Sequence, residues 1–146
     1  MSPVGIPIVQ PYRHPHKYEV QTHMQKITLS EFNDLLPVSP ARQRAAFPPN
    51  FVHSLDASHM MYTAMACHEE GLTFTSVHDS FWTHAADVDT MSRVLREQFV
   101  RLYEEPILEQ FRESLVLRYS MVKFPEVPAK GKLDIKKVMD APYFFS

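Results

Sequence analysis

Asp79 is the residue whose type and place most clearly suggest chemistry, and it directly follows His78. Residues 72–83 alternate between apolar and polar types and are rich in β-formers, so they predict two short strands that meet at His78 and Asp79. A carboxylate at such a turn suits a hard divalent cation, because these cations prefer oxygen ligands. The alternative interpretation is that aspartate is simply a favourable turn residue.

A second group of polar side chains lies in residues 53–59, which read HSLDASH. On a helix, His53 and His59 each neighbour Asp56 at an i,i+3 spacing, but they diverge from each other. A zinc-binding pair prefers an i,i+4 spacing, so the pattern disfavours zinc. It favours hydrogen bonding to a polynucleotide backbone or to a neighbouring strand, and the alternative is an ordinary polar helix surface.

The composition excludes several other kinds of site. The chain has 146 residues, a formal net charge of −2 and 45% hydrophobic residues, which suits about one domain and gives no strongly basic field. Cys67 is the only cysteine, so a disulfide framework and a Cys-based zinc site are excluded. Three glycines leave no room for a Gly-rich phosphate loop, and no nucleophile elbow supports a serine hydrolase. No apolar run approaches the roughly 20 residues that span a bilayer, so we expect no membrane partner.

Both ends of the chain are punctuated by proline. Residues 1–49 contain prolines that interrupt every candidate element, so we expect an arm in which residues 18–29 form a strand or a hairpin. Beyond residue 120 we expect a Pro-punctuated linker, a short amphipathic stretch near 133–139 and an aromatic end at 143–146.

From residue 50 onward the sequence predicts a helix, a β-hairpin and two further helices, which is an α+β arrangement. Asn50 is expected to cap a helix that runs to about Glu69, Asp87 to cap the second helix, and Pro106 to open the third. Trp82 is expected to pack against the small sheet. The positions expected to face the core are Phe51, Leu55, Met61, Tyr62, Met65 and Ala66, then Met91, Val94, Leu95, Phe99 and Leu102, and last Leu108, Phe111, Leu115 and Tyr119.

Several motifs carry a resemblance to a known family. The two longest are PPNFVHSLDASHM at residues 48–60 and SVHDSFWTH at residues 76–84. The shorter ones are GIPIVQPY at 5–12, REQFV at 96–100, PEVPAKG at 125–131 and YFFS at 143–146. Together they resemble the C-terminal part of the single-subunit, phage-type DNA-directed RNA polymerases, most closely the mitochondrial ones of fungal type.

The resemblance implies a right-hand polymerase fold. Residues 50–146 would hold the last palm and fingers elements and end in a hydrophobic aromatic foot, while residues 1–49 resemble the region of the promoter specificity loop. By position, Asp79 matches one of two palm aspartates that hold the catalytic Mg²⁺ ions. His78 would be its catalytic neighbour, close to the RNA 3′ end.

The same resemblance implies contacts with nucleic acid. His53 matches a helix residue that faces the primer–template minor groove. The specificity loop would span roughly residues 16–44, and Arg42 and Arg44 are its conspicuous basic residues. The implied partners are template and promoter DNA, the RNA product, ribonucleoside triphosphates and mitochondrial transcription factors, and the implied location is the mitochondrial matrix.

The family places its first palm aspartate, its nucleotide-binding fingers helix and its thumb upstream of this stretch. We therefore expect a C-terminal segment that is inactive alone and that needs these upstream polymerase regions as partners. One alternative is a non-catalytic nucleic-acid-binding or interaction remnant of the same fold, for which Asp79 would not matter. Another is a small His/Asp metal hydrolase, which the spacing of His53 and His59 disfavours.

Overall fold

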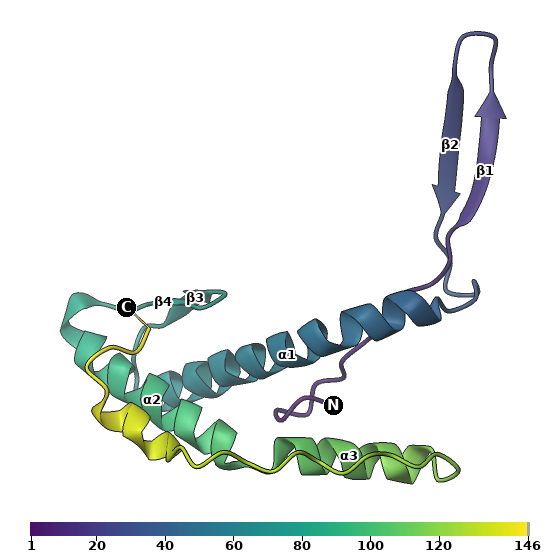
Figure 1. Cartoon of the computed structure of the whole chain (residues 1–146). Helices are drawn as coiled ribbons and strands as arrows, with labels where there is room; N and C mark the ends of the chain where they lie inside the picture. The colour runs from purple at the N-terminus through teal and green to yellow at the C-terminus, as the bar shows by residue number, and fades with distance from the viewer. Residues whose placement is uncertain (146) are drawn as a thin grey trace. The chain divides into compact units, whose positions relative to one another are not determined.

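The computed structural model describes residues 1–145, and Ser146, the last residue of the expected aromatic foot, lies outside the described residues. The chain divides into two compact units, Pro7–Ser54 and the combination of Met1–Ile6 with residues 55–145. Within the described residues, two β-hairpins and three α-helices confirm the α+β class (Figure 1). The division between the units falls inside a helix rather than in a linker.

The hairpin that we expected in the N-terminal arm is present in the unit Pro7–Ser54. Strand β1 (His16–Gln21) pairs antiparallel with strand β2 (Lys26–Glu31), and Tyr18 lies opposite Leu29. Side chains alternate between the two faces of a strand, so the apolar residues gather on one face. Every residue of both strands is exposed within this unit.

Helix α1 (Pro40–Glu69) begins well before Asn50, so the prediction that Asn50 caps it is wrong. Pro48 and Pro49 lie inside the helix, although we expected them to interrupt it. Each proline lacks the N–H group that would bond the carbonyl four residues earlier. Those carbonyls belong to exposed residues, where water can satisfy them, and the helix therefore tolerates the pair.

The start of α1 has a local signal that the sequence analysis missed. Ser39 is a favoured N-cap type and Pro40 suits the first helical position. The Ser39 carbonyl accepts the Gln43 N–H at 3.0 Å. The Asn50 side chain instead donates to the Tyr12 hydroxyl oxygen at 3.0 Å, which ties the helix to the segment before β1.

The core of the second unit involves helix α2 (Val88–Glu104). This helix follows a short 3₁₀ turn, η1 (Ala85–Asp87), and Asp87 occupies the predicted N-cap position, although its side chain makes no capping hydrogen bond. The buried residues of α2 are Met91, Val94, Leu95, Val100 and Leu102. The face that we expected to be buried is therefore largely confirmed, with Phe99 half-buried beside it.

The buried face of α1 differs from the one that we expected. Met65, an expected core residue, is 60% exposed, whereas Ser58, His59, Thr63 and Cys67 are buried. His59, Thr63 and Cys67 recur at every fourth position and so line one face of the helix. The Thr63 hydroxyl donates to the His59 carbonyl at 2.9 Å, which satisfies this polar group inside the helix. A count of apolar residues does not reveal such a face.

Helix α3 (Ile107–Arg118) begins directly after Pro106, as predicted. None of its residues is buried, and Leu108 and Tyr119 are exposed, so the prediction that these two face the core is wrong. The expected amphipathic stretch forms a 3₁₀ helix, η2 (Ile135–Asp140). Among residues 1–145, no helix is long and apolar enough to cross a membrane.

Candidate functional site

The predicted strands around the His-Asp pair are present. Strand β3 (Thr75–Val77) pairs antiparallel with strand β4 (Ser80–Trp82), and His78 and Asp79 form the two-residue turn between them. Tight turns of this kind require positive φ angles, which glycine adopts most easily. His78 has a φ of 56°, and both turn side chains are exposed. The structure thus places a carboxylate and an imidazole together at an accessible tip.

Aromatic packing anchors this hairpin to its unit. Phe81 of β4 lies 6.0 Å from Phe74, measured between ring centres, and both rings pack against the buried core. The Thr83 hydroxyl adds a 2.7 Å hydrogen bond to the Thr73 carbonyl. Trp82 is 49% exposed, so the expectation that it packs against the sheet is wrong. Neighbouring side chains in a strand point to opposite faces, and Phe81 occupies the inner one.

His59 is a core residue and does not belong to a polar helix surface. It is 4% exposed, and its Nε2 lies 2.8 Å from the Leu95 carbonyl oxygen, so Nε2 carries a hydrogen and donates it. Burial lowers the pKa of His59, against the opposing effects of the Leu95 hydrogen bond and of Asp56. The ring is buried and donates to a carbonyl of helix α2, so its partner within the chain is a helix and not the neighbouring strand that we expected.

The three expected nucleic-acid contacts lie on α1, in the unit Pro7–Ser54. His53, Arg42 and Arg44 are all exposed. The two arginines belong to the first turns of the helix rather than to the β1–β2 hairpin. Residues two apart on a helix do not share a face, so Arg42 and Arg44 point in different directions.

The described residues do not form a complete metal site. Within residues 1–145, no group of three or more His, Cys, Asp or Glu side chains is arranged to hold a metal ion. Asp79 offers a single exposed carboxylate, which is one ligand of the several that Mg²⁺ requires. A catalytic ion at Asp79 would therefore need further ligands.

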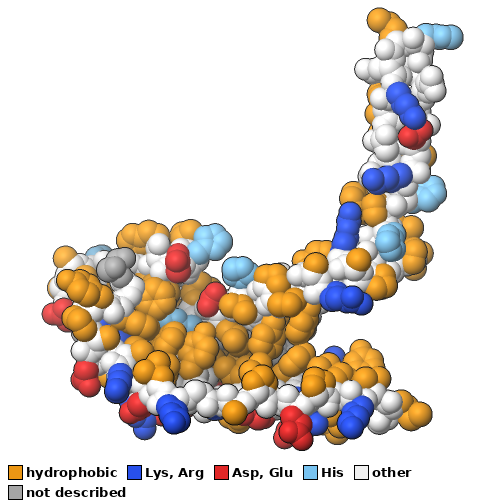
Figure 2. Space-filling model, in the orientation of Figure 1, with side chains coloured by type: hydrophobic (Ala, Val, Ile, Leu, Met, Phe, Trp, Pro, Cys, Tyr) orange, Lys and Arg blue, Asp and Glu red, His pale blue; other side chains and the backbone are white. Residues whose placement is uncertain are grey.

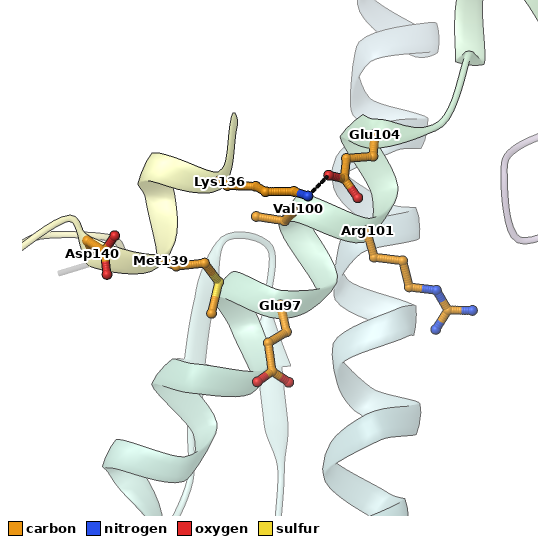
Figure 3. A pocket seen from close by; sticks show the side chains of 7 residues that line it. All are labelled: Glu97, Val100, Arg101, Glu104, Lys136, Met139 and Asp140. Carbon is orange, nitrogen blue, oxygen red and sulfur yellow. Dashed lines mark ion pairs between the residues drawn. The ribbon is translucent and has the colours of Figure 1, made fainter. Parts of the chain in front are cut away.

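An open pocket of about 520 Å³ lies between α2 and η2, and the sequence analysis did not anticipate it (Figure 3). Lys136 and Glu104 form an ion pair across it at 3.2 Å, and Glu97 pairs with Arg93 at 3.0 Å. Three of its charged side chains thus take part in ion pairs. The lining residues are Glu97, Val100, Arg101, Glu104, Lys136, Met139 and Asp140.

Comparison with known proteins identifies the class. The DNA-dependent RNA polymerase family matches residues 1–122 of this chain. The chain is 52% identical over 145 residues to the protein named DNA-directed RNA polymerase 1A of Nicotiana tabacum, and the match covers 99% of this chain and 92% of that protein. The chain belongs to the DNA-dependent RNA polymerase family, as a part of the phage-type, single-subunit kind.

Longer relatives place the match within much larger proteins. The chain is 52% identical to DNA-directed RNA polymerase 1, mitochondrial, of Arabidopsis thaliana, and 51% identical to DNA-directed RNA polymerase 3, chloroplastic, of Nicotiana sylvestris. In both cases the match covers 99% of this chain but only 15% of the relative. These relatives are plant proteins of either organelle, so the expected likeness to the fungal type gains no support from them.

Proposed function

We propose that this chain is the C-terminal palm and fingers portion of an RNA polymerase that transcribes organellar DNA, and that Asp79 supplies one carboxylate to its catalytic site. The observation that carries the proposal is the His78–Asp79 turn. Both side chains reach solvent at the tip of a hairpin whose base is anchored by aromatic packing. Such a tip can meet groups brought by another part of the polymerase.

The backbone of His78 supports a chemical role for this turn. A residue other than glycine at a φ of 56° costs roughly 1–3 kcal/mol, and such strain clusters at functional sites. Glycine would relieve the strain without altering the hairpin. The presence of histidine instead of glycine at this position is consistent with a role of the imidazole in the reaction.

We assign the roles by residue. The Asp79 carboxylate would bind Mg²⁺ together with a carboxylate from the upstream polymerase regions, and the His78 imidazole would lie near the RNA 3′ end. When bound, the ions supply positive charge that activates the 3′-hydroxyl and stabilises the phosphate oxygens during nucleotidyl transfer. His53 would face the primer–template duplex. The substrates would be ribonucleoside triphosphates and a DNA template.

Promoter contact is assigned to the arm. The β1–β2 hairpin is exposed along its whole length and precedes Arg42 and Arg44, which offer positive charge to phosphates.

We place the protein in the mitochondrial matrix, with mitochondrial transcription factors as further partners. Relatives named as mitochondrial support this location, and those named as chloroplastic make the plastid the competing one. Fractionation of organelles with an antibody against this chain distinguishes the two.

The test is RNA extension by a reassembled polymerase. The full chain would replace the matching segment of the Arabidopsis relative, and primer extension and template binding would be measured side by side. We expect extension by the assembled protein, none by the chain alone, and at least about a 100-fold loss in Asp79→Asn, since a metal ligand supplies several kcal/mol. Template binding should persist in that variant.

A matched control is Asp134→Asn, which alters an exposed aspartate at the N-cap of η2, where the asparagine side-chain oxygen can still accept the Lys136 N–H. It should extend RNA as the unaltered protein does. If the unaltered protein, Asp79→Asn and Asp134→Asn all bind template equally and none extends RNA, the result would instead support the non-catalytic nucleic-acid-binding remnant.

A further inference from the structure

Arg96 of α2 holds the C-terminal segment of the chain. Its Nη1 donates to the Val138 carbonyl at 2.6 Å and to the Ala141 carbonyl at 2.7 Å. The guanidinium carbon also lies 5.3 Å from the centre of the Phe144 ring. These contacts join residues more than 40 positions apart in the sequence, and the arginine that makes them is half-buried. One side chain thus fixes both the end of η2 and the residues that follow it.

The segment that Arg96 holds places the Phe144 ring against the core and the half-exposed Phe145 ring beside the buried His59. Phe144 packs edge-on against Phe99 of α2, with ring centres 5.2 Å apart. Phe145 stacks on the buried His59 at 5.6 Å, with the two rings inclined by only 20°. Phe145 has a φ of 52°, which is unfavourable for a residue with a side chain. Its contacts must outweigh that strain, so its position depends on the surrounding packing.

Phe145 links this segment to the hairpin of the candidate site. Its ring meets Phe81 edge-on at 5.3 Å, and Phe81 also lies 6.2 Å from the His59 ring. Phe81 is the second residue after Asp79 in the chain. A continuous set of contacts therefore runs from Arg96, through the C-terminal segment and the Phe145 ring, to the strand that begins directly after the turn.

We infer that Arg96 is a positioning residue for the Asp79 turn, and that it acts by holding Phe145 between His59 and Phe81. The consequence for catalysis rests on the proposed function, whereas the coupling itself is a property of this chain. Arginine suits the task because its Nη1 donates to both carbonyls while its planar guanidinium lies over an aromatic ring, and lysine has no planar group to place over that ring.

The experiment follows NMR signals of the full chain in four proteins: the unaltered chain, Arg96→Gln, Phe145→Ala and Arg93→Gln. The reporters are the His59 ring protons, which feel the stacked Phe145 ring, and the backbone amides of His78 and Asp79. The side-chain N–H of Trp82, the only tryptophan, reports on β4. Phe145→Ala tests the coupling at the half-exposed ring itself, where the risk of unfolding is small.

We expect Arg96→Gln and Phe145→Ala to shift the His59, His78, Asp79 and Trp82 signals in the same direction. Arg93→Gln is the matched control, because Arg93 also lies on α2 but bonds Glu70 and Glu97 instead of the C-terminal segment. It should leave these signals in place, and Arg96→Lys should restore them only in part. If Phe145→Ala leaves the His78 and Asp79 amides unmoved, the inference is overturned whether or not Arg96→Gln folds.

Catalysis gives the second readout. In the reassembled polymerase, Arg96→Gln should lower kcat about 10-fold with the KM for ribonucleoside triphosphates unchanged, because misplacement of a catalytic group slows the chemical step. An active polymerase whose kcat is insensitive to Arg96→Gln contradicts the positioning role and leaves the proposed function intact. A reassembled protein without activity counts against the proposed function, while the NMR signals still decide the coupling.

Discussion

Among single residues, His78 allows a structural role to be separated from a chemical one. We expect His78→Gly to stabilise the chain by up to about 2 kcal/mol, because relief of roughly 1–3 kcal/mol of backbone strain outweighs the roughly 0.5–1 kcal/mol of extra entropy that glycine loses on folding. His84→Gly is the control, since His84 is exposed and has an ordinary φ of −67°. That variant should lose about 0.5–1 kcal/mol. Urea unfolding measures both, and a His78→Gly protein that loses more than His84→Gly contradicts the account of the turn.

His59 makes the stability of the chain depend on pH. Burial lowers the pKa of the folded ring below the ordinary value of 6.5, so the unfolded chain binds the proton more readily. The stability contributed by the neutral ring is complete above pH 6.5 and is lost as the pH falls from there through the lowered pKa. We expect the melting temperature to drop between pH 7.5 and pH 5.5, and to drop less in His59→Gln, which keeps an N–H donor for the Leu95 carbonyl. Equal drops in both proteins would rule out this titration.

Cys67 offers a probe of core opening. It is fully buried, and burial together with the nearby Glu70 raises the pKa of its thiol. We expect a thiol reagent at pH 7.5 to modify Cys67 only as fast as the unit opens, and at once after unfolding in urea. Immediate modification of the folded chain would show that the helix face bearing His59, Thr63 and Cys67 is not packed as described.

Helix α1 gives the clearest prediction for a whole element. Replacing Pro48 and Pro49 together by alanine should restore two internal hydrogen bonds and raise the free energy of unfolding by about 3 kcal/mol or more. Pro40→Ala is the matched control, since proline is tolerated at the first helical position, and its effect should be small. Circular dichroism during urea unfolding measures the change. No gain in the double variant would mean that α1 does not run through the proline pair.

Elements with a strong local signal could be predicted from the sequence, and those set by packing could not. The alternation in residues 72–83 revealed β3 and β4, and Pro106 marked the start of α3. The buried face of α1 could not be inferred, because it is made of small and polar side chains chosen by contact with α2. For the site, Asp79 and its turn were predictable, whereas the link from Arg96 joins residues that are distant in sequence.

At the scale of the whole molecule, exposed apolar side chains predict self-association of the isolated chain. Figure 2 shows hydrophobic side chains over α3, where Leu117 is 84% exposed, and Met121 just beyond it is 97% exposed. Exposed groups of this kind favour association with another surface. We expect oligomers at micromolar concentration by sedimentation velocity, and fewer in a chain that carries Leu117→Lys and Met121→Lys.

Glu113→Lys is the control for that experiment, because it alters the charge of α3 without removing apolar surface. It should leave the degree of association unchanged. A chain that stays monomeric and melts cooperatively would show that this surface needs no cover, and would weaken the view that it normally meets the upstream polymerase regions.

The central claim is that Asp79 binds a divalent cation used in RNA synthesis. The most direct measurement replaces Mg²⁺ by Fe²⁺ in the reassembled polymerase with its nucleic acid bound, and maps where hydroxyl radicals formed at the iron cut the chain. We expect cuts around residues 78–80 that disappear in Asp79→Asn and persist in Asp134→Asn. Cuts that spare this turn, or that survive Asp79→Asn unchanged, would contradict the central claim.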